Sequence, residues 1–173
     1  MMRRLVLLML LLLAACPLEA RELRVPADGK QALLVELPRG WQTKADADGG
    51  MLLIPPAASQ HAMLYLGILS DPALEGAMDV AVAARVGRKV GVIGFDKQEL
   101  ARITDGKGVV HHGTTFTARV PEKHGMSRKA KIVIVPLGPH TWAQAWIVTQ
   151  PGMNYVEYNK LNAVLESITL AGE

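Results

Sequence analysis

Short apolar runs separated by turn residues occupy most of this 173-residue chain and constrain its fold more than any other feature. The runs predict strands at residues 31–37, 51–54, 62–69, 99–103, 109–120, 130–135 and 142–148. Most successive strands are joined by connections too short for the crossover that parallel pairing requires. The pattern therefore predicts antiparallel pairing.

Two helices are expected, over residues 72–89 and 155–168. Asp71 can cap the first helix, with Pro72 in its first turn. Its apolar positions recur at helical spacing and are Leu74, Ala77, Met78 and Ala81. Asn154 and Glu157 resemble a capping box at the start of the second helix. The order of strands, helix, strand meander and helix predicts an α+β domain over residues 31–170, with one antiparallel sheet and both helices packed on it.

Two segments carry a resemblance to a known family. The first is Glu36-Leu37-Pro38-Arg39-Gly40-Trp41, and the second places Leu161 and Val164-Leu165 before Ser167-Ile168. With the helix and meander between them, the chain resembles the PsbP-like superfamily, which includes the extrinsic subunit of photosystem II and a Ran-binding protein. The resemblance implies an α/β/α sandwich and an accessory, non-catalytic role. It implies no catalytic residues.

The first twenty residues have the three parts of a secretory signal peptide. Arg3 and Arg4 precede an apolar run over residues 5–13, and small residues follow. The run is about half the ~20 residues that a transmembrane helix needs. We therefore expect an exported protein, located in the periplasm or anchored to a membrane and facing the periplasm.

Two cleavage sites compete. Residues 13–16, Leu-Ala-Ala-Cys, resemble a lipobox, which would leave Cys16 lipidated at the new N-terminus, although Pro17 is an unusual neighbour. Leu18-Glu19-Ala20 is the alternative, with Leu18 a poor substitute for a small residue. We favour lipidation of Cys16, with residues 21–30 as part of a tether between the lipid and the domain.

Cysteine content and charge exclude several classes of function. Cys16 is the only cysteine, so the mature domain has no internal disulfide and no thiolate metal site. From Arg21 onward the chain has 17 Lys and Arg against 15 Asp and Glu, a net charge of +2. This small excess gives no case for binding nucleic acid.

Metal binding is the main alternative function. His61-Ala62-Met63 and His124-Gly125-Met126 share a His-x-Met pattern, and imidazole with thioether suits Cu(I). The alternative is therefore a periplasmic copper-binding protein. His111 and His112 are adjacent on a predicted strand and should point to opposite faces. Residues 46–50 resemble a calcium loop, but Ala57 occupies the position where a Glu would be needed, so we predict a polar turn.

No catalytic motif is present. The chain lacks a Gly-x-Ser-x-Gly turn, an HExxH pair and a Gly-rich phosphate loop. We therefore expect no enzymatic activity and no cofactor. A hydrolase with an unrecognised site is a third, weaker hypothesis.

A basic segment is the candidate partner-binding site. It contains one anion, Glu122, and five cations, which are Arg119, Lys123, Arg128, Lys129 and Lys131. Residues 121–127 in its centre predict a hairpin loop, and loops often carry binding residues. We expect a non-catalytic accessory or binding protein of the cell envelope, whose partner is an envelope protein or an anionic surface.

Overall fold

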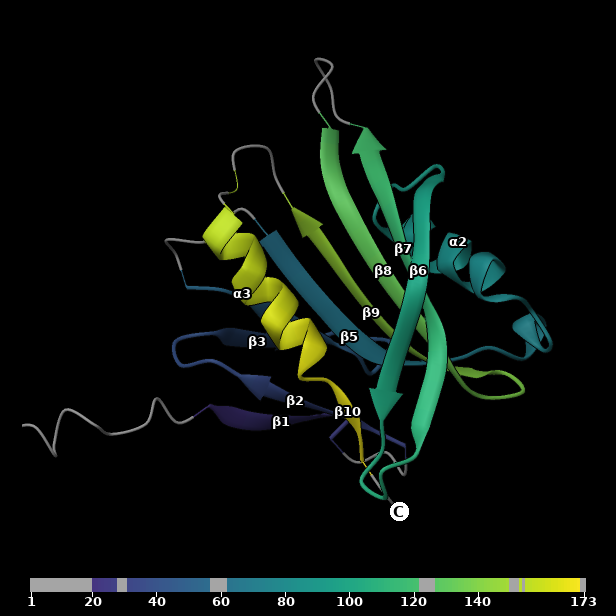
Figure 1. Cartoon of the computed structure of the whole chain (residues 1–173), viewed down its shortest axis with the longest axis horizontal. Helices are drawn as coiled ribbons and strands as arrows, with labels where there is room; N and C mark the ends of the chain where they lie inside the picture. The colour runs from purple at the N-terminus through teal and green to yellow at the C-terminus, as the bar shows by residue number, and fades with distance from the viewer. Residues whose placement is uncertain are drawn as a thin grey trace, which may run out of the picture.

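The computed structural model describes residues 20–27, 31–56, 62–121, 127–149, 153 and 155–171, and within them the chain forms two antiparallel sheets and two α-helices (Figure 1). In the larger sheet the strand order is β3 (Gln42–Ala45), β4 (Met51–Ile54), β5 (Ala62–Ser70), β9 (Thr141–Thr149), β8 (Ser127–Gly138), β7 (Val110–Pro121) and β6 (Phe95–Thr104). Every neighbouring pair is antiparallel, as the short connections predicted.

The smaller sheet was not anticipated. Its order is β1 (Arg21–Val25), β2 (Leu33–Leu37) and β10 (Thr169–Leu170). The expectation of a single sheet is therefore wrong, because β2 pairs with the two ends of the domain rather than with the meander. Residues 21–25, which we had assigned to a tether, form a strand, since Leu23 and Val25 alternate with Glu22 and Arg24 and are buried.

The first helix is shorter than predicted. A 3₁₀ turn, Pro72–Leu74, is capped by Asp71, and the chain then passes through Gly76 in the left-handed region at φ 69°. Helix α2 (Asp79–Lys89) begins only after this break. It consequently buries Val82 and Val86, whereas Met78, one of the apolar positions that predicted the helix, precedes it and is 74% exposed. Helix α3 (Tyr155–Glu166) matches its predicted position, and its inward residues include Leu161 and Leu165.

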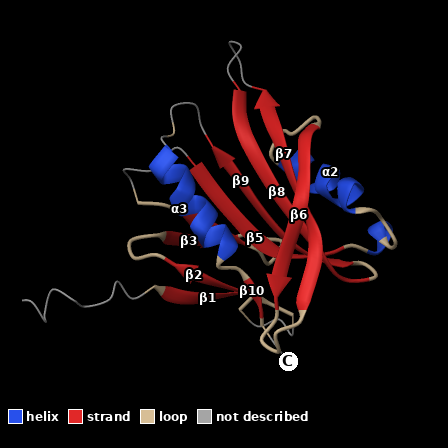
Figure 2. Cartoon of the chain, in the orientation of Figure 1, coloured by secondary structure: helices blue, strands red, loops and turns tan. Residues whose placement is uncertain are grey.

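The larger sheet separates two apolar clusters. Figure 2 shows the two helices beside different parts of this sheet. Helix α2 packs on β7 and β8, and we call this side of the larger sheet the α2 face. Helix α3 and the smaller sheet pack on the opposite side, which we call the α3 face. Side chains alternate between the faces along each strand. Among the described residues, no helix is long and apolar enough to cross a membrane.

Candidate functional site

The β7–β8 hairpin places most of the predicted basic residues at one end of the larger sheet. Pro121 pairs with Ser127, so the predicted loop is the hairpin connection, although Lys123 lies outside the described residues. Arg119 pairs directly with Lys129, and both side chains are exposed. Directly opposed residues point to the same face. Two cations are therefore held side by side on the α3 face.

The remaining basic residues do not all join this pair. Lys131 also points to the α3 face, where its Nζ donates a hydrogen bond to Asn162 Oδ1 of α3 at 3.0 Å. Arg128 is half-buried and points to the α2 face, because neighbouring strand residues alternate. The described part of the basic segment is thus divided between the two faces.

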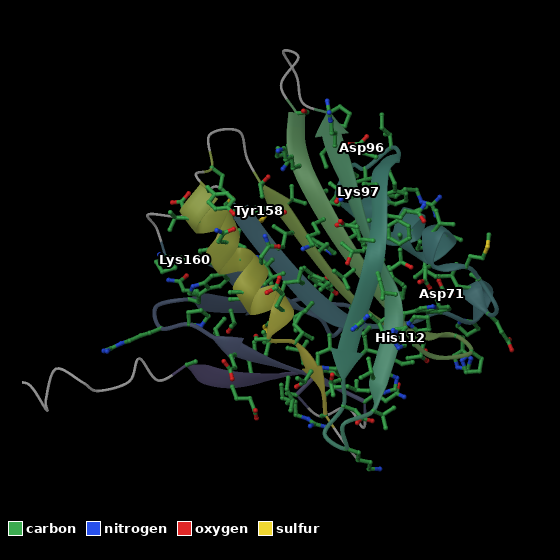
Figure 3. The ribbon with its side chains drawn as sticks, viewed as in Figure 1. Asp71, Asp96, Lys97, His112, Tyr158 and Lys160 are labelled. Carbon is green, nitrogen blue, oxygen red and sulfur yellow. The ribbon has the colours of Figure 1, made fainter. Side chains whose placement is uncertain are left out.

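Carboxylates on β6 moderate the charge of the hairpin. Arg119 Nε lies 3.5 Å from Asp96 Oδ2, and both side chains are exposed. Lys97 Nζ lies 2.6 Å from Glu99 Oε1. The pKa of Glu99 lies below its usual range because Lys97 donates a hydrogen bond to the carboxylate and its positive charge stabilises the ionised form. The positive charge of Lys131 lowers the pKa by a smaller amount. Figure 3 shows Asp96 and Lys97 at the same end of the molecule as the hairpin.

A second feature is a groove of about 550 Å³ between α3, the end of β2, the turn that follows β2, and the two prolines that follow β4. The first of the two segments that carry the family resemblance, residues 36–41, ends at this groove. Trp41 N donates to Pro38 O at 3.3 Å, and Gly40 between them has φ 86°, a conformation that favours glycine. Trp41 lines the groove with Met153 and Leu161, while Lys160 is among the charged residues at its edge. Lys160 and Tyr158 lie on α3 (Figure 3). The groove offers apolar surface beside charges of both signs.

The predicted metal ligands are only partly visible. Three of them, His61, His124 and Met126, lie outside the described residues, as does Cys16, the predicted lipidation site. Met63 is on β5 and is 39% exposed. Within the described ranges, no three His, Cys, Asp or Glu side chains come together in a group that could hold a metal ion.

The structure separates the two adjacent histidines and confirms the polar turn. His112 is exposed, whereas His111 is half-buried and its Nε2 lies 3.6 Å from Asp105 Oδ2, without a hydrogen bond among the described residues. Residues 46–50 form the polar turn between β3 and β4, closed by a hydrogen bond from Asp46 N to Gly50 O.

Comparison with known proteins gives matches among solved structures. No family model matches the chain, and no curated protein sequence matches it. The structure of LpqN, which is involved in cell envelope biogenesis of Mycobacterium tuberculosis, is similar with a TM-score of 0.52 and 15% identity, over 88% of this chain and 91% of LpqN. The chain has the PsbP/Mog1 fold.

Three further solved structures are similar with lower TM-scores. Cyanobacterial PsbP (CyanoP) from Synechocystis has a TM-score of 0.48 and 12% identity, over 90% of this chain and 95% of that protein. The Ran-binding protein Mog1p of Saccharomyces cerevisiae has a TM-score of 0.47 and 13% identity, over 86% of this chain and 95% of Mog1p. The chain spans 46% of the length of a similar protein from Bacteroides thetaiotaomicron, with a TM-score of 0.46 and 12% identity.

Proposed function

We propose that this protein is an exported, non-catalytic accessory protein of the cell envelope that is lipid-anchored through Cys16 and binds an anionic surface through the β7–β8 hairpin. The leader sequence supports export. The similarity to LpqN is a similarity of fold, and an envelope role is compatible with it. The contact surface would be formed by Arg119 and Lys129 on the α3 face, together with Lys123. Arg128 lies on the other face, and Lys131 is bonded to Asn162, so we expect both to contribute less.

The observation that carries this proposal is the direct pairing of Arg119 with Lys129. Like charges directly opposite on neighbouring strands destabilise a sheet. Asp96 relieves part of this repulsion for Arg119, but no ion pair joins Lys129 to a carboxylate among the described residues. An anionic partner would supply the missing negative charge. The pairing is therefore more easily explained by a binding surface than by folding stability.

The test is binding to vesicles that contain anionic lipid, compared with neutral vesicles. Arg119, Lys123 and Lys129 are replaced together by Gln, and Arg128 is left in place because it is half-buried. Each cation near an anionic membrane contributes about 1 kcal/mol, so affinity should fall roughly a hundredfold. Binding of the wild type should also weaken at high salt, because screening shortens the range of the attraction.

A matched control replaces Lys44, Arg102 and Lys107 by Gln. These residues are exposed on β3, on β6 and in the β6–β7 turn, and the change in net charge is the same. The control variant should bind like the wild type. If the hairpin variant and the control variant bind vesicles equally well, the hairpin is a solvated surface. If the hairpin variant binds vesicles normally but no longer retains an envelope protein in pull-downs, the partner is a protein.

A further inference from the structure

A separate cleft opens on the α2 face, away from the basic hairpin. Its volume is about 780 Å³, and it lies between the end of β5, the last turns of α2 and the β3–β4 turn. The lining residues that matter here are Asp48, Asp71, Arg85, Arg88, Lys89 and Gln144. The cleft lies near the Ser70–Thr141 pair of β5 and β9, whereas the hairpin adjoins the other end of these strands, where Thr149 pairs with Ala62. Figure 3 shows Asp71 far from Lys160 on α3.

The wall of the cleft carries one positive charge in excess. Arg85, Arg88 and Lys89 have the i, i+3, i+4 spacing that places side chains on one side of a helix. Arg85 Nη2 lies 3.0 Å from Asp71 Oδ2, and Lys89 forms an ion pair with Asp48. These two pairs neutralise four of the five charges.

Arg88 is the remaining charge. Its side chain is exposed to the cleft and forms no ion pair or hydrogen bond with the described residues. Cations near a helix C-terminus are favoured by the helix dipole, which could account for Arg88 alone. It does not account for what lies at the base of the cleft.

The base contains Gln144, a polar side chain that is only 4% exposed. Its amide forms no hydrogen bond with the part of the chain that the structure describes. Trp142 and Trp146 flank it on the same face of β9, and its cross-strand neighbour on β5 is Gly67, which contributes no side chain that could cover or bond it. A ligand in the cleft would give this amide the hydrogen-bond partner that the described residues do not supply.

We propose that this cleft binds a small oxyanion, a carboxylate or a phosphate group, held by the guanidinium of Arg88 and the side-chain amide of Gln144. The planar guanidinium donates two parallel hydrogen bonds to such groups, and the amide N–H₂ donates from the base of the cleft. A single negative charge balances the excess charge of the wall. Because Arg85 pairs with Asp71 and Lys89 pairs with Asp48, Arg88 is the cation that the oxyanion would balance.

The test is an NMR titration of the purified full chain with inorganic phosphate, with acetate and with sodium chloride as the ionic-strength control. We expect saturable shifts of the Arg88 Nε–H and the Gln144 side-chain amide, with a Kd of about 1–10 mM for at least one oxyanion. Saturation by phosphate alone indicates a phosphate ligand, and saturation by acetate alone indicates a carboxylate ligand. Sodium chloride should give only small, linear changes.

Two variants locate the site. Arg88→Gln should weaken binding at least tenfold, and this exposed position lets the variant fold normally. Gln144→Leu should also weaken binding, with the unfolding midpoint measured in parallel. Arg102→Gln, an equal loss of charge on β6, should leave the Kd unchanged. The proposal would be overturned if neither phosphate nor acetate gave saturation, or if Arg88→Gln left the Kd unchanged. Neither result bears on vesicle binding by the hairpin.

Discussion

Tyr65 lies on the α2 face, where the β3–β4 turn folds over it. Its ring stacks on Trp146 with centroids 5.1 Å apart and an interplanar angle of 8°. The residue is 5% exposed, and its hydroxyl forms no hydrogen bond within the described residues. The turn can approach this closely only because position 50 is glycine, since a Cβ there would lie 2.0 Å from the Tyr65 hydroxyl oxygen.

Gly50→Ala should therefore destabilise the protein by about 1–3 kcal/mol, the usual cost of overpacking. The ring cannot move aside without losing its contact with Trp146. Gly94→Ala is the matched control, because a Cβ at Gly94 has no neighbour within 4 Å and its backbone is not left-handed. Urea denaturation of both variants measures the difference, and an equal effect at the two positions would contradict the packing argument.

Tyr65 should also make stability fall at high pH. Burial, with smaller effects from the carboxylates of Asp46 and Asp48, raises the pKa of Tyr65 to about 12. An unfolded tyrosine ionises near pH 10, so between about pH 10 and about pH 12 the unfolded state releases a proton that the folded state retains. The free energy of unfolding must then decrease as pH rises through this range.

Tyr65→Phe removes this dependence. Urea midpoints at about pH 9 and about pH 11 should fall less for Tyr65→Phe than for the wild type. The variant should be at least as stable as the wild type near neutral pH, because the lost hydroxyl has no partner among the described residues. Parallel pH profiles of the two proteins would show that Tyr65 ionises normally.

Strand β9 is central to the larger sheet and carries two tryptophans on the α2 face, in agreement with the sequence pattern. Their burial differs: Trp142 is 2% exposed, whereas Trp146 is only half-buried. Trp142→Ala should cost about 3–5 kcal/mol, and Trp146→Ala about 1–3 kcal/mol. Comparing the two variants by chemical denaturation keeps strand, face and residue type constant. A larger loss for Trp146→Ala would indicate that its stacking on Tyr65 outweighs burial.

Local periodicity predicted the longer strands and both α-helices at least in part, although the alternation in β1 was overlooked. The strand over Met51–Ile54 was predicted with its observed bounds, and α3 begins at Tyr155 as expected. Strand β3 was missed because all four of its residues are exposed and show no alternation of burial. The two-residue strand β10 is too short to have a pattern. The helix before Asp79 was overextended because spacing alone does not reveal the left-handed Gly76.

The smaller sheet and the cleft depend on contacts between residues far apart in the sequence, which local patterns do not predict. The smaller sheet joins residues near positions 25 and 170, and no local pattern specifies such a contact. The same limit applies to the cleft. The cations at the end of α2 were visible in the sequence, but Gln144 is about sixty residues away and reaches them only through sheet packing. The basic hairpin was predictable because its residues are close in sequence.

The position of β1 determines where a lipid on Cys16 would hold the domain, if Cys16 is lipidated as we predict. Strand β1 begins at Arg21, immediately after the alternative cleavage site, so either cut leaves the strand whole. A lipid on Cys16 would be joined to β1 by five residue steps, which span at most about 17 Å. The smaller sheet would then be held close to the membrane. Two or three acyl chains would anchor the protein far more firmly than one.

Mass spectrometry of the mature N-terminus measures this directly. We expect a chain that begins at Cys16 and carries a diacylglyceryl group and an amide-linked acyl chain. The wild type should remain with membranes in high salt and be released by detergent, because acyl chains rather than charges hold it there. Cys16→Ser should appear in the soluble fraction or remain as uncleaved precursor. A mature chain beginning at Arg21 without added mass would show that the site after Ala20 is used and that no lipid anchor exists.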